Sequence, residues 1–576
     1  MTGAIRRPAW LERARFYEIY PQSFADANGD GIGDLPGIIR HLDYIEDLGC
    51  NALWINPCYD SPFKDAGYDV RDYTRVAERY GANDDLVALF DAAHRRGMHV
   101  LLDLVPGHTS EEHAWFRAGA RADPADRHLP GTAEDFSERY IWTDCWISGG
   151  DGLPFVGGEE ERDGTYILNF FKCQPALNYG FAHPKHAWQK RALGPEALAT
   201  CDAMLDVMRF WLSRGADGFR VDMADSLVKH DDGGKPYTIR TWQYMFSKIR
   251  PEFPEAAFVS EWGRPGESMQ AGFDMDFYLD WRWDGWPNGY NILLRNTDTP
   301  LVREGDASYF NADSETSIKG FLDQYLMQLR DTERFGGYFD LITGNHDTLR
   351  VGQRLTAREL KVAYGMLLTM PGCPFLYYGD EICMPYRPLP TKEGGYVRTG
   401  SRTPMQWDDT PNRGFSAAPA GRLYLPVGED GGSPDVAGEK RDADSLYHWV
   451  RAVLGVRAGR RALDAGGRFD VIAAPEHGRL FAYERGAKGR SDGAAAYGDS
   501  GVEVGDAGAG AGGPADAGDR VIVAMNPGRG EESFALPQWA RRSAAGAGPG
   551  VLLSVGDVRI RGDAVALGPQ SFAVIG

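Results

Sequence analysis

Eight short apolar segments recur along the first two thirds of the chain, and most of them alternate with segments of helix-like pattern. The apolar segments are Phe16–Tyr20, Ala52–Asn56, His99–Val105, Gly218–Asp222, Phe258–Glu261, Met275–Leu279, Leu341–Asn345 and Pro374–Tyr378. The helix-like segments include Leu35–Leu48, Asp84–Arg96, Ala199–Arg214, Ser317–Thr332 and Arg358–Met370. Strands that alternate with helices pair in parallel. Eight such units predict an α/β fold of the (β/α)8 TIM barrel type, with its active site at the C-terminal ends of the strands.

The alternation stops in two places, which divides the chain into three predicted parts. The segment 109–184 is too long for a strand-to-helix loop, so we expect an inserted subdomain after the third strand. The barrel then comprises 1–108 and 185–458. Short apolar segments in 459–576 predict a C-terminal antiparallel β-domain: Arg468–Ala473, Leu480–Tyr483, Val521–Ala524 and Ser571–Ile575. Within that domain, the Gly, Ala, Asp and Ser of 486–518 predict a disordered insertion.

Charge and cysteine content limit the partners and the compartment. The 576 residues carry a net charge of −20, which argues against nucleic acid or an anionic membrane as partner. Seven scattered cysteines without a CxxC pair favour reduced thiols, and we see neither an export signal nor an apolar run of membrane-spanning length. We therefore expect a cytoplasmic protein. The aromatic content of 12% suits stacking on a ring-shaped ligand. The oligomeric state stays open.

The most informative strand is Gly218–Asp222, because it ends in two charged residues. Arg220 and Asp222 are two positions apart, so their side chains share one face of a strand. A cation beside a carboxylate lowers its pKa and keeps it ionised, as a nucleophile requires. An isolated pair of this kind is more often a structural ion pair. Acids at the ends of other predicted strands (Asp103, Glu261 and His346-Asp347) favour the catalytic interpretation.

An early loop has the pattern of a calcium site. Oxygen-bearing residues stand at alternate positions around a glycine turn: Asp26, Asn28, Asp30, Ile32 (through its carbonyl) and Asp34. This matches the first half of an EF-hand-like loop, although the twelfth position is a glycine and a strand precedes it. We expect one structural Ca²⁺. The alternative is a metal-free Asx turn. No organic cofactor is predicted.

Five segments in combination resemble the α-amylase superfamily, glycoside hydrolase family 13, over almost the whole chain. They are Asp103-Leu-Val-Pro-Gly-His108, Gln174-Pro-Ala-Leu-Asn178, Gly218-Phe-Arg-Val-Asp222, Val259-Ser-Glu-Trp262 and Asn345-His346-Asp347. The finer resemblance is to the oligo-1,6-glucosidase, neutral α-glucosidase and trehalose synthase group. It is carried by the loop 26–34, Gly67-Tyr68-Asp69, Arg350 and Ser401-Arg402-Thr-Pro-Met-Gln-Trp-Asp408.

The resemblance implies roles for individual residues. Asp222 matches the family's nucleophile, Glu261 its acid/base and Asp347 its third acid. Asp69, with Arg350 or Arg402, matches residues that hold a terminal glucose at the bottom of a pocket. The other predicted substrate-binding residues are Tyr68, His108, Arg220, Met223 and His346. Each histidine, taken alone, is more often structural.

The chain also departs from the family pattern. Gly107 stands where the first segment usually has Asn, and Ala176 where the fifth usually has Asp. Ser260 and Trp262 are unusual neighbours of the acid/base, and Met223 follows the nucleophile. None of these removes a catalytic group, but together they leave the substrate open.

The expected activity is hydrolysis of short α-linked gluco-oligosaccharides or disaccharides from the non-reducing end, with retention through a covalent intermediate. An α-glucosyl transferase or isomerase, such as a trehalose synthase, would use the same three acids. A non-catalytic carbohydrate-binding member of the family would be expected to have lost an acid, whereas this chain keeps all three.

Overall fold

The computed structural model describes residues 7–132, 134–147, 149–279, 289–294, 307–394, 398–428, 433–487, 519–541 and 548–576. The predicted disordered insertion at 486–518 lies outside these residues, except for its first two positions.

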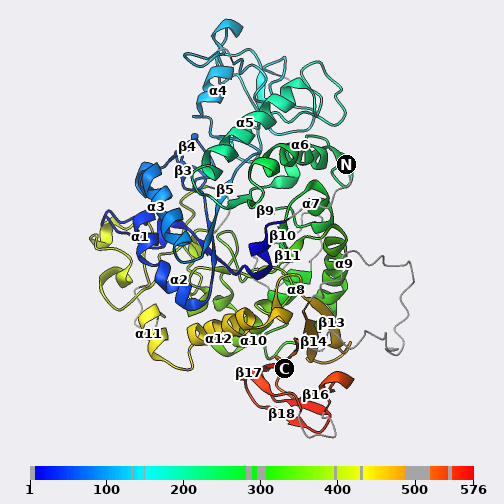
Figure 1. Cartoon of the computed structure of the whole chain (residues 1–576). Coiled ribbons are helices and arrows are strands. Elements are labelled where there is room, and N and C mark those ends of the chain that lie inside the picture. The colour runs from blue at the N-terminus through cyan, green and yellow to red at the C-terminus, as the bar shows by residue number, and fades with distance from the viewer. Residues whose placement is uncertain are drawn as a thin grey trace.

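Eight parallel strands form one sheet in the order β11-β10-β9-β8-β5-β2-β1-β12, at the centre of Figure 1. Their bounds are β1 (Phe16–Ile19), β2 (Ala52–Ile55), β5 (His99–Leu104), β8 (Gly218–Val221), β9 (Ala257–Ser260), β10 (Met275–Phe277), β11 (Tyr338–Asp340) and β12 (Phe375–Tyr377). The two edges meet where Ile342, just after β11, pairs in parallel with Phe375 of β12. The predicted TIM barrel is confirmed.

The barrel strands are buried on both faces, as parallel strands covered by helices should be. Every residue of β2, β8 and β9 is buried, so these strands show no alternation of buried and exposed positions, and apart from Arg220 and Ser260 they are apolar. The seventh strand differs from the prediction, because β11 ends where the predicted segment Leu341–Asn345 begins. Beyond β11 the chain still bonds to β12, since the Thr343 amide donates to the Phe375 carbonyl (3.0 Å), while the Thr343 hydroxyl donates to Asp380 (2.7 Å).

Helices surround the barrel (Figure 1). They are α1 (Leu35–Arg40), α2 (Leu42–Leu48), α3 (Asn83–His94), α5 (Pro195–Leu212), α6 (Pro236–Glu252), α7 (Pro265–Ala271), α8 (Gly289–Leu294), α9 (Lys319–Phe335) and α10 (Ala357–Leu367). The predicted single helix Leu35–Leu48 is two helices that meet at His41, whose ring stacks on Trp407 at 3.6 Å between centroids.

The segment between β5 and α5 projects from one end of the barrel, at the top of Figure 1. It contains α4 (Ala114–Gly119) and the antiparallel pair β6 (Phe155–Gly157) and β7 (Thr165–Ile167). A second antiparallel pair, β3 (Tyr59–Asp60) and β4 (Asp72–Val76), follows β2. A bridge between His108 and Ala176 ties the projecting segment to the end of β5.

The C-terminal part is an antiparallel β-structure at the opposite end of the molecule (Figure 1). One sheet has the order β13-β14-β15-β20-β17 and the other β16-β19-β18. The strands are β13 (Arg468–Ala473), β14 (Phe481–Gly486), β15 (Arg520–Asn526), β16 (Glu532–Ala535), β17 (Val551–Val555), β18 (Val558–Arg561), β19 (Ala564–Leu567) and β20 (Ser571–Ile575). Helix α11 (Val436–Arg441) precedes α12 (Leu446–Gly459), and α10 and α12 contact this sheet.

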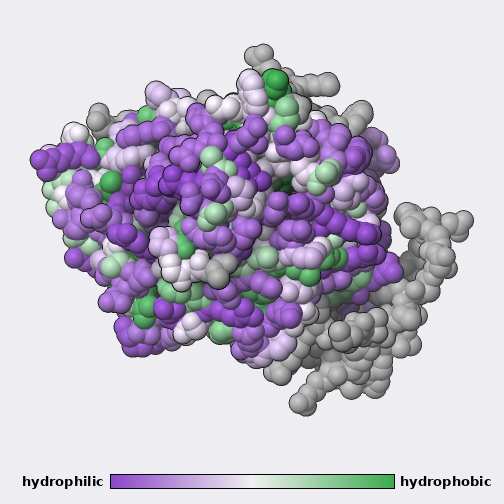
Figure 2. Space-filling model, turned by 90° about the horizontal axis from the view of Figure 1, so that it is seen from above, coloured by the Kyte–Doolittle hydropathy of each residue, from purple (hydrophilic) through white to green (hydrophobic). Residues whose placement is uncertain are grey.

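The surface is mainly hydrophilic on the face seen in Figure 2, where hydrophobic residues are scattered among charged ones. Within the described part of the chain, no helix is long and apolar enough to cross a membrane.

Candidate active site

One buried guanidinium joins three carboxylates at the C-terminal ends of the strands. Arg220 of β8 donates through Nη1 to Asp103 Oδ1 (2.9 Å) and Asp222 Oδ1 (3.0 Å). Its Nη2 lies 2.7 Å from Glu261 Oε2. Asp103 belongs to β5, whereas Asp222 and Glu261 directly follow β8 and β9. The barrel therefore brings together residues that are more than a hundred positions apart in the sequence.

The expectation that the pKa of Asp222 is lowered beside Arg220 is wrong in direction. Burial and the neighbouring Glu261 raise the pKa of Asp222 well above its usual value, and Arg220 only partly opposes them. The reason is that the single positive charge of Arg220 is shared among three acids. Two carboxylates so close to one cation favour a state in which one of them keeps a proton, as in other catalytic carboxyl pairs. The side chains of Asp222 and Glu261 are still 11% and 6% exposed, so both border an opening.

Asp347 is held as an anion. Its Oδ1 accepts hydrogen bonds from Arg398 Nη1 (2.7 Å) and Arg402 Nη2 (2.8 Å). Its Oδ2 lies 3.3 Å from His346 Nε2. Burial alone would raise the pKa of this carboxyl, but these three cations hold it well below the usual range.

His346 is the cation that links Asp347 to the barrel. Burial opposes its charge, but Asp347 and Glu18 raise the pKa of the imidazole to about 9. Burial also raises the pKa of Glu18, whose Oε1 lies 2.9 Å from His346 Nδ1. Asp347 is the larger of the two influences that raise the pKa of His346, and Glu18 adds to it. A 2.7 Å contact between His346 Nε2 and the Tyr68 hydroxyl fixes the ring.

The pair that closes the site beside Asp347 is Asp65 and Arg398, which the sequence did not predict. Arg398 Nη2 donates to Asp65 Oδ1, and Gln174 donates to the other oxygen at 2.7 Å. Arg402 donates to Glu393 (3.0 Å) and to Asp347. A chain of buried ion pairs thus runs from Asp65, in the loop between β3 and β4, through Arg398 to Asp347 and Arg402.

The sequence resemblance suggested that Asp69 acts together with Arg350 or Arg402. In the structure, Asp69 and Arg350 bind different partners. Both Asp69 oxygens accept hydrogen bonds from the loop 61–65, and burial raises the pKa of this carboxyl to about 6. Arg350 donates to the Tyr378 carbonyl (2.8 Å) and to Asp380 (3.0 Å). Asp69 and Arg350 therefore have separate partners in the structure, and the prediction that Asp69, with Arg350 or Arg402, holds a terminal glucose stays a prediction. Asp65 and Arg398, each four positions earlier in its motif than Asp69 and Arg402, form the pair instead.

His108 is neutral and oriented by groups from two segments. Its Nε2–H donates to the Tyr68 carbonyl (3.1 Å), and its Nδ1 accepts from Asn169 (3.0 Å). Burial lowers the pKa of the imidazole to about 3. Asn169 also accepts from the buried Lys229 at 3.1 Å, and burial lowers the pKa of that ammonium to about 8. Asn169 and Lys229 were missed because neither belongs to a motif used in the sequence analysis.

Met223, directly after Asp222, has a backbone φ of +41°. A non-glycine residue in this region is strained, and such residues concentrate at functional sites. Its N–H donates to Glu261 Oε2 at 3.0 Å. The strained turn thus supplies Glu261 with a hydrogen bond in addition to its ion pair with Arg220.

The loop predicted to bind calcium closes on its own hydrogen bonds. Asp26 accepts from two glycine amides of the loop (2.7 and 2.8 Å), and Asp34 from three backbone amides. Asn28 and Asp30 each accept from the amide two positions on, as in Asx turns. In the described part of the chain, no three acidic, histidine or cysteine side chains converge on a possible metal position. The donor types, with the Ile32 carbonyl, suit Ca²⁺, and calcium binding stays a prediction.

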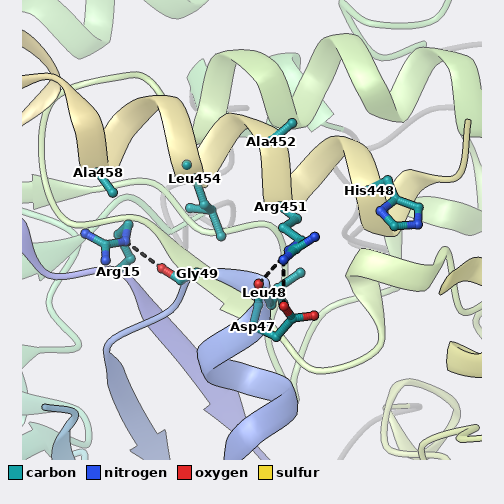
Figure 3. A pocket seen from close by; sticks show the side chains of 10 residues that line it. Arg15, Asp47, Leu48, Gly49, His448, Arg451, Ala452, Leu454 and Ala458 are labelled. Carbon is teal, nitrogen blue, oxygen red and sulfur yellow. Dashed lines mark hydrogen bonds and ion pairs between the residues drawn. The ribbon is translucent and has the colours of Figure 1, made fainter. Parts of the chain in front are cut away.

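A cavity of about 390 Å³ lies elsewhere, between the end of α2 and α12 (Figure 3). Arg15, which precedes β1, and Gly49, which precedes β2, line it, so it opens at the N-terminal ends of the strands. Arg451 pairs across it with Asp47 at 2.7 Å. Asp222, Glu261 and Asp347 lie toward the C-terminal ends of the strands. This cavity is therefore separate from the candidate active site.

The arrangement supplies what cleavage of a glycosidic bond with retention requires. Asp222 and Glu261 contact the same guanidinium, and a short carboxyl separation is typical of retaining enzymes, about 5 to 5.5 Å. Asp347 provides a fixed negative charge beside them for a sugar ring that becomes positive in the transition state.

The comparisons with known proteins agree with this chemistry. The family model described as alpha amylase, catalytic domain, matches residues 18–466. A trehalose synthase/amylase TreS from Mycolicibacterium smegmatis is 33% identical over 79% of this chain and 77% of its own length. An oligo-1,6-glucosidase from Heyndrickxia coagulans is 30% identical over 83% of this chain and 90% of its own length. The solved structure of trehalulose synthase MutB from Pseudomonas mesoacidophila MX-45 has a TM-score of 0.71 at 22% identity, covering 98% of this chain and 99% of MutB. With its profile match and its three acids at the strand ends, this chain belongs to the α-amylase family of glycoside hydrolases, family 13.

Proposed function

We propose that the chain is a retaining α-glucosidase that removes the terminal glucose from short α-glucosides at the non-reducing end. The observation that carries this proposal is the chain of buried ion pairs from Asp65 through Arg398 and Asp347 to Arg402. It forms a wall beside the three acids, built of groups that bind sugar hydroxyls by charge-assisted hydrogen bonds. We expect such a wall to close the far side of the first sugar subsite, so that the end of a sugar chain enters and a residue in its middle does not.

The residues would act in two steps. Asp222 attacks the anomeric carbon while Glu261 gives its proton to the leaving oxygen, which forms a glucosyl ester on Asp222. Glu261 then takes a proton from water, and the water oxygen displaces Asp222, so that α-glucose is released and both acids are restored. Asp347, ionised throughout, accepts hydrogen bonds from the sugar and stabilises its positive charge.

A second candidate is an isomerase that transfers the glucosyl group to another hydroxyl of the sugar that has just left. It is supported by the three acids that the chain keeps, Asp222, Glu261 and Asp347, because an isomerase would use the same groups. The similarity to a trehalose synthase/amylase points the same way.

Product analysis decides between these activities. The purified protein is incubated with maltose, maltotriose, trehalose, sucrose and soluble starch, and NMR follows the first-formed products. A hydrolase releases α-glucose from the short substrates and acts slowly on starch, whereas an isomerase converts one disaccharide into another with little free glucose. Rapid internal cleavage of starch would contradict the terminal-pocket proposal, and first-formed β-glucose would contradict retention.

A further inference from the structure

The buried carboxyl group of Asp276 accepts hydrogen bonds from residues on both sides of the acid/base candidate Glu261. Asp276 lies in the middle of β10 and pairs with Ser260 across the ladder. Its Oδ1 accepts from the Ser260 hydroxyl (2.8 Å) and from the backbone amides of Trp262 (3.1 Å) and Gly263 (3.2 Å). A single oxygen atom therefore holds the residue before Glu261 and the two residues after it.

The position of the Asp276 carboxyl group costs folding free energy, because the group is buried and only partly hydrogen-bonded. Asp276 is fully buried, and its Oδ2 has no hydrogen-bond partner within the described part of the chain. Burial raises the pKa of Asp276 to about 8, against the effect of its hydrogen bonds. A buried polar atom without a partner costs about 1–3 kcal/mol. In return, the carboxyl group accepts hydrogen bonds from three donors, all of which belong to residues next to or near Glu261 in the chain.

Glu261 is therefore held both at the tip of its side chain and at its backbone. Arg220 and the Met223 amide hold the tip of its side chain, at 2.7 and 3.0 Å. Asp276 holds the backbone from which that side chain extends. Proton transfer to a leaving oxygen depends on such placement, and a misplacement of about 1 Å can reduce a rate about 100-fold.

We propose that Asp276 is a positioning residue that sets the orientation of Glu261 for proton transfer to the leaving group. This inference rests on the proposed function, in which Glu261 is the acid/base. It also accounts for the unusual Ser260, whose hydroxyl donates to this oxygen, whereas Trp262 contributes only its backbone amide.

The test compares two substrates that differ in their need for protonation. A disaccharide has a poor leaving group and needs the acid, whereas α-glucosyl fluoride needs it little. We expect Asp276→Ala to lower kcat/KM for the disaccharide about 10- to 100-fold and to change it less than about 3-fold for the fluoride. Asp276→Asn keeps an acceptor oxygen at Oδ1, so it should recover most of the disaccharide activity.

A matched control is available on the neighbouring strand. Asp340 of β11 is also fully buried, accepts the Cys373 amide at 2.7 Å, and has an Oδ2 without a partner among the described residues. Asp340→Ala should lower the melting temperature as Asp276→Ala does, but should affect the two substrates equally. If Asp276→Ala does not fold, Ser260→Ala removes one of the three donors and should show a smaller selective loss on the disaccharide.

The outcomes separate the inference from the function on which it rests. Glu261→Gln must itself lower kcat/KM much more for the disaccharide than for the fluoride. If it does not, the acid/base role of Glu261 is wrong. If it does, but Asp276→Ala or the fallback Ser260→Ala affects both substrates alike, the positioning role is overturned.

Discussion

The ion-pair wall can be broken at Arg398 without changing any of the three acids. Arg398 is 8% exposed and joins Asp347, at 2.7 Å, to Asp65. In Arg398→Met, Asp65 keeps only a neutral donor, and Asp347 loses one of three cations. Removing one partner of a buried pair destabilises a fold by about 3–5 kcal/mol. A charge-assisted hydrogen bond at the site is worth about 1.5–3 kcal/mol, which converts to a loss in kcat/KM of about 10- to 150-fold.

Arg350→Met is the matched control, because Arg350 is as deeply buried (2% exposed) and pairs with Asp380 at 3.0 Å instead. Both variants should have a lower melting temperature. In steady-state kinetics on maltose and soluble starch, below both melting temperatures, only Arg398→Met should lose kcat/KM for maltose by the factor above. It should also gain relative activity on starch, since the wall is opened. Normal maltose kinetics in Arg398→Met, or an equal loss in Arg350→Met, would refute the wall as the glucose-binding element.

Three further predictions follow from the same groups. Asp222→Asn should reduce turnover of every glucoside, including α-glucosyl fluoride, by at least about 1,000-fold, with an unchanged circular dichroism spectrum; residual activity near that of the wild type would exclude it as the nucleophile. The pKa of His346 is raised to about 9, so its contribution to stability is complete below about pH 6.5 and is lost as the pH rises through 9; urea unfolding at pH 6 and pH 9.5 should show this loss, and His346→Gln should lessen it. Adding Ca²⁺ should raise the melting temperature of the wild type but not of Asp30→Ala, whereas no shift in either would leave the 26–34 loop as a hydrogen-bonded turn.

The barrel could be predicted because its signals are local. Each strand is a short apolar run that ends in a polar residue, and the three acids stand at such ends. The C-terminal strands β16 to β19 were not predicted. They are only four or five residues long and partly exposed: in β17 and β18 only Val555 is buried, although β17 begins with the apolar run Val551-Leu552-Leu553.

The Asp65–Arg398 pair shows what linear motifs omit. The two residues are 333 positions apart, and both lie in loops without hydrophobic periodicity. Motif matching chose Asp69 and Arg402, which stand in the more distinctive segments. A usable signal was present, because an acid precedes Asp69 by four positions and an arginine precedes Arg402 by four. Nothing in the sequence alone says that these two loops meet.

The departure at Gly107 has a physical counterpart in the segment that follows β5. A Cβ at position 107 would lie 3.0 Å from the side-chain nitrogen of Asn169, so a larger residue there would displace that amide. Asn169 uses the space to donate to His108 and to accept from Lys229. The amide absent from the first signature is thus supplied from a position sixty-one residues after His108. Gly107 and Asn169 form one unit, because the small residue makes room for the amide that orients the histidine. The orientation of His108 therefore depends on the segment after β5 as well as on the barrel motifs.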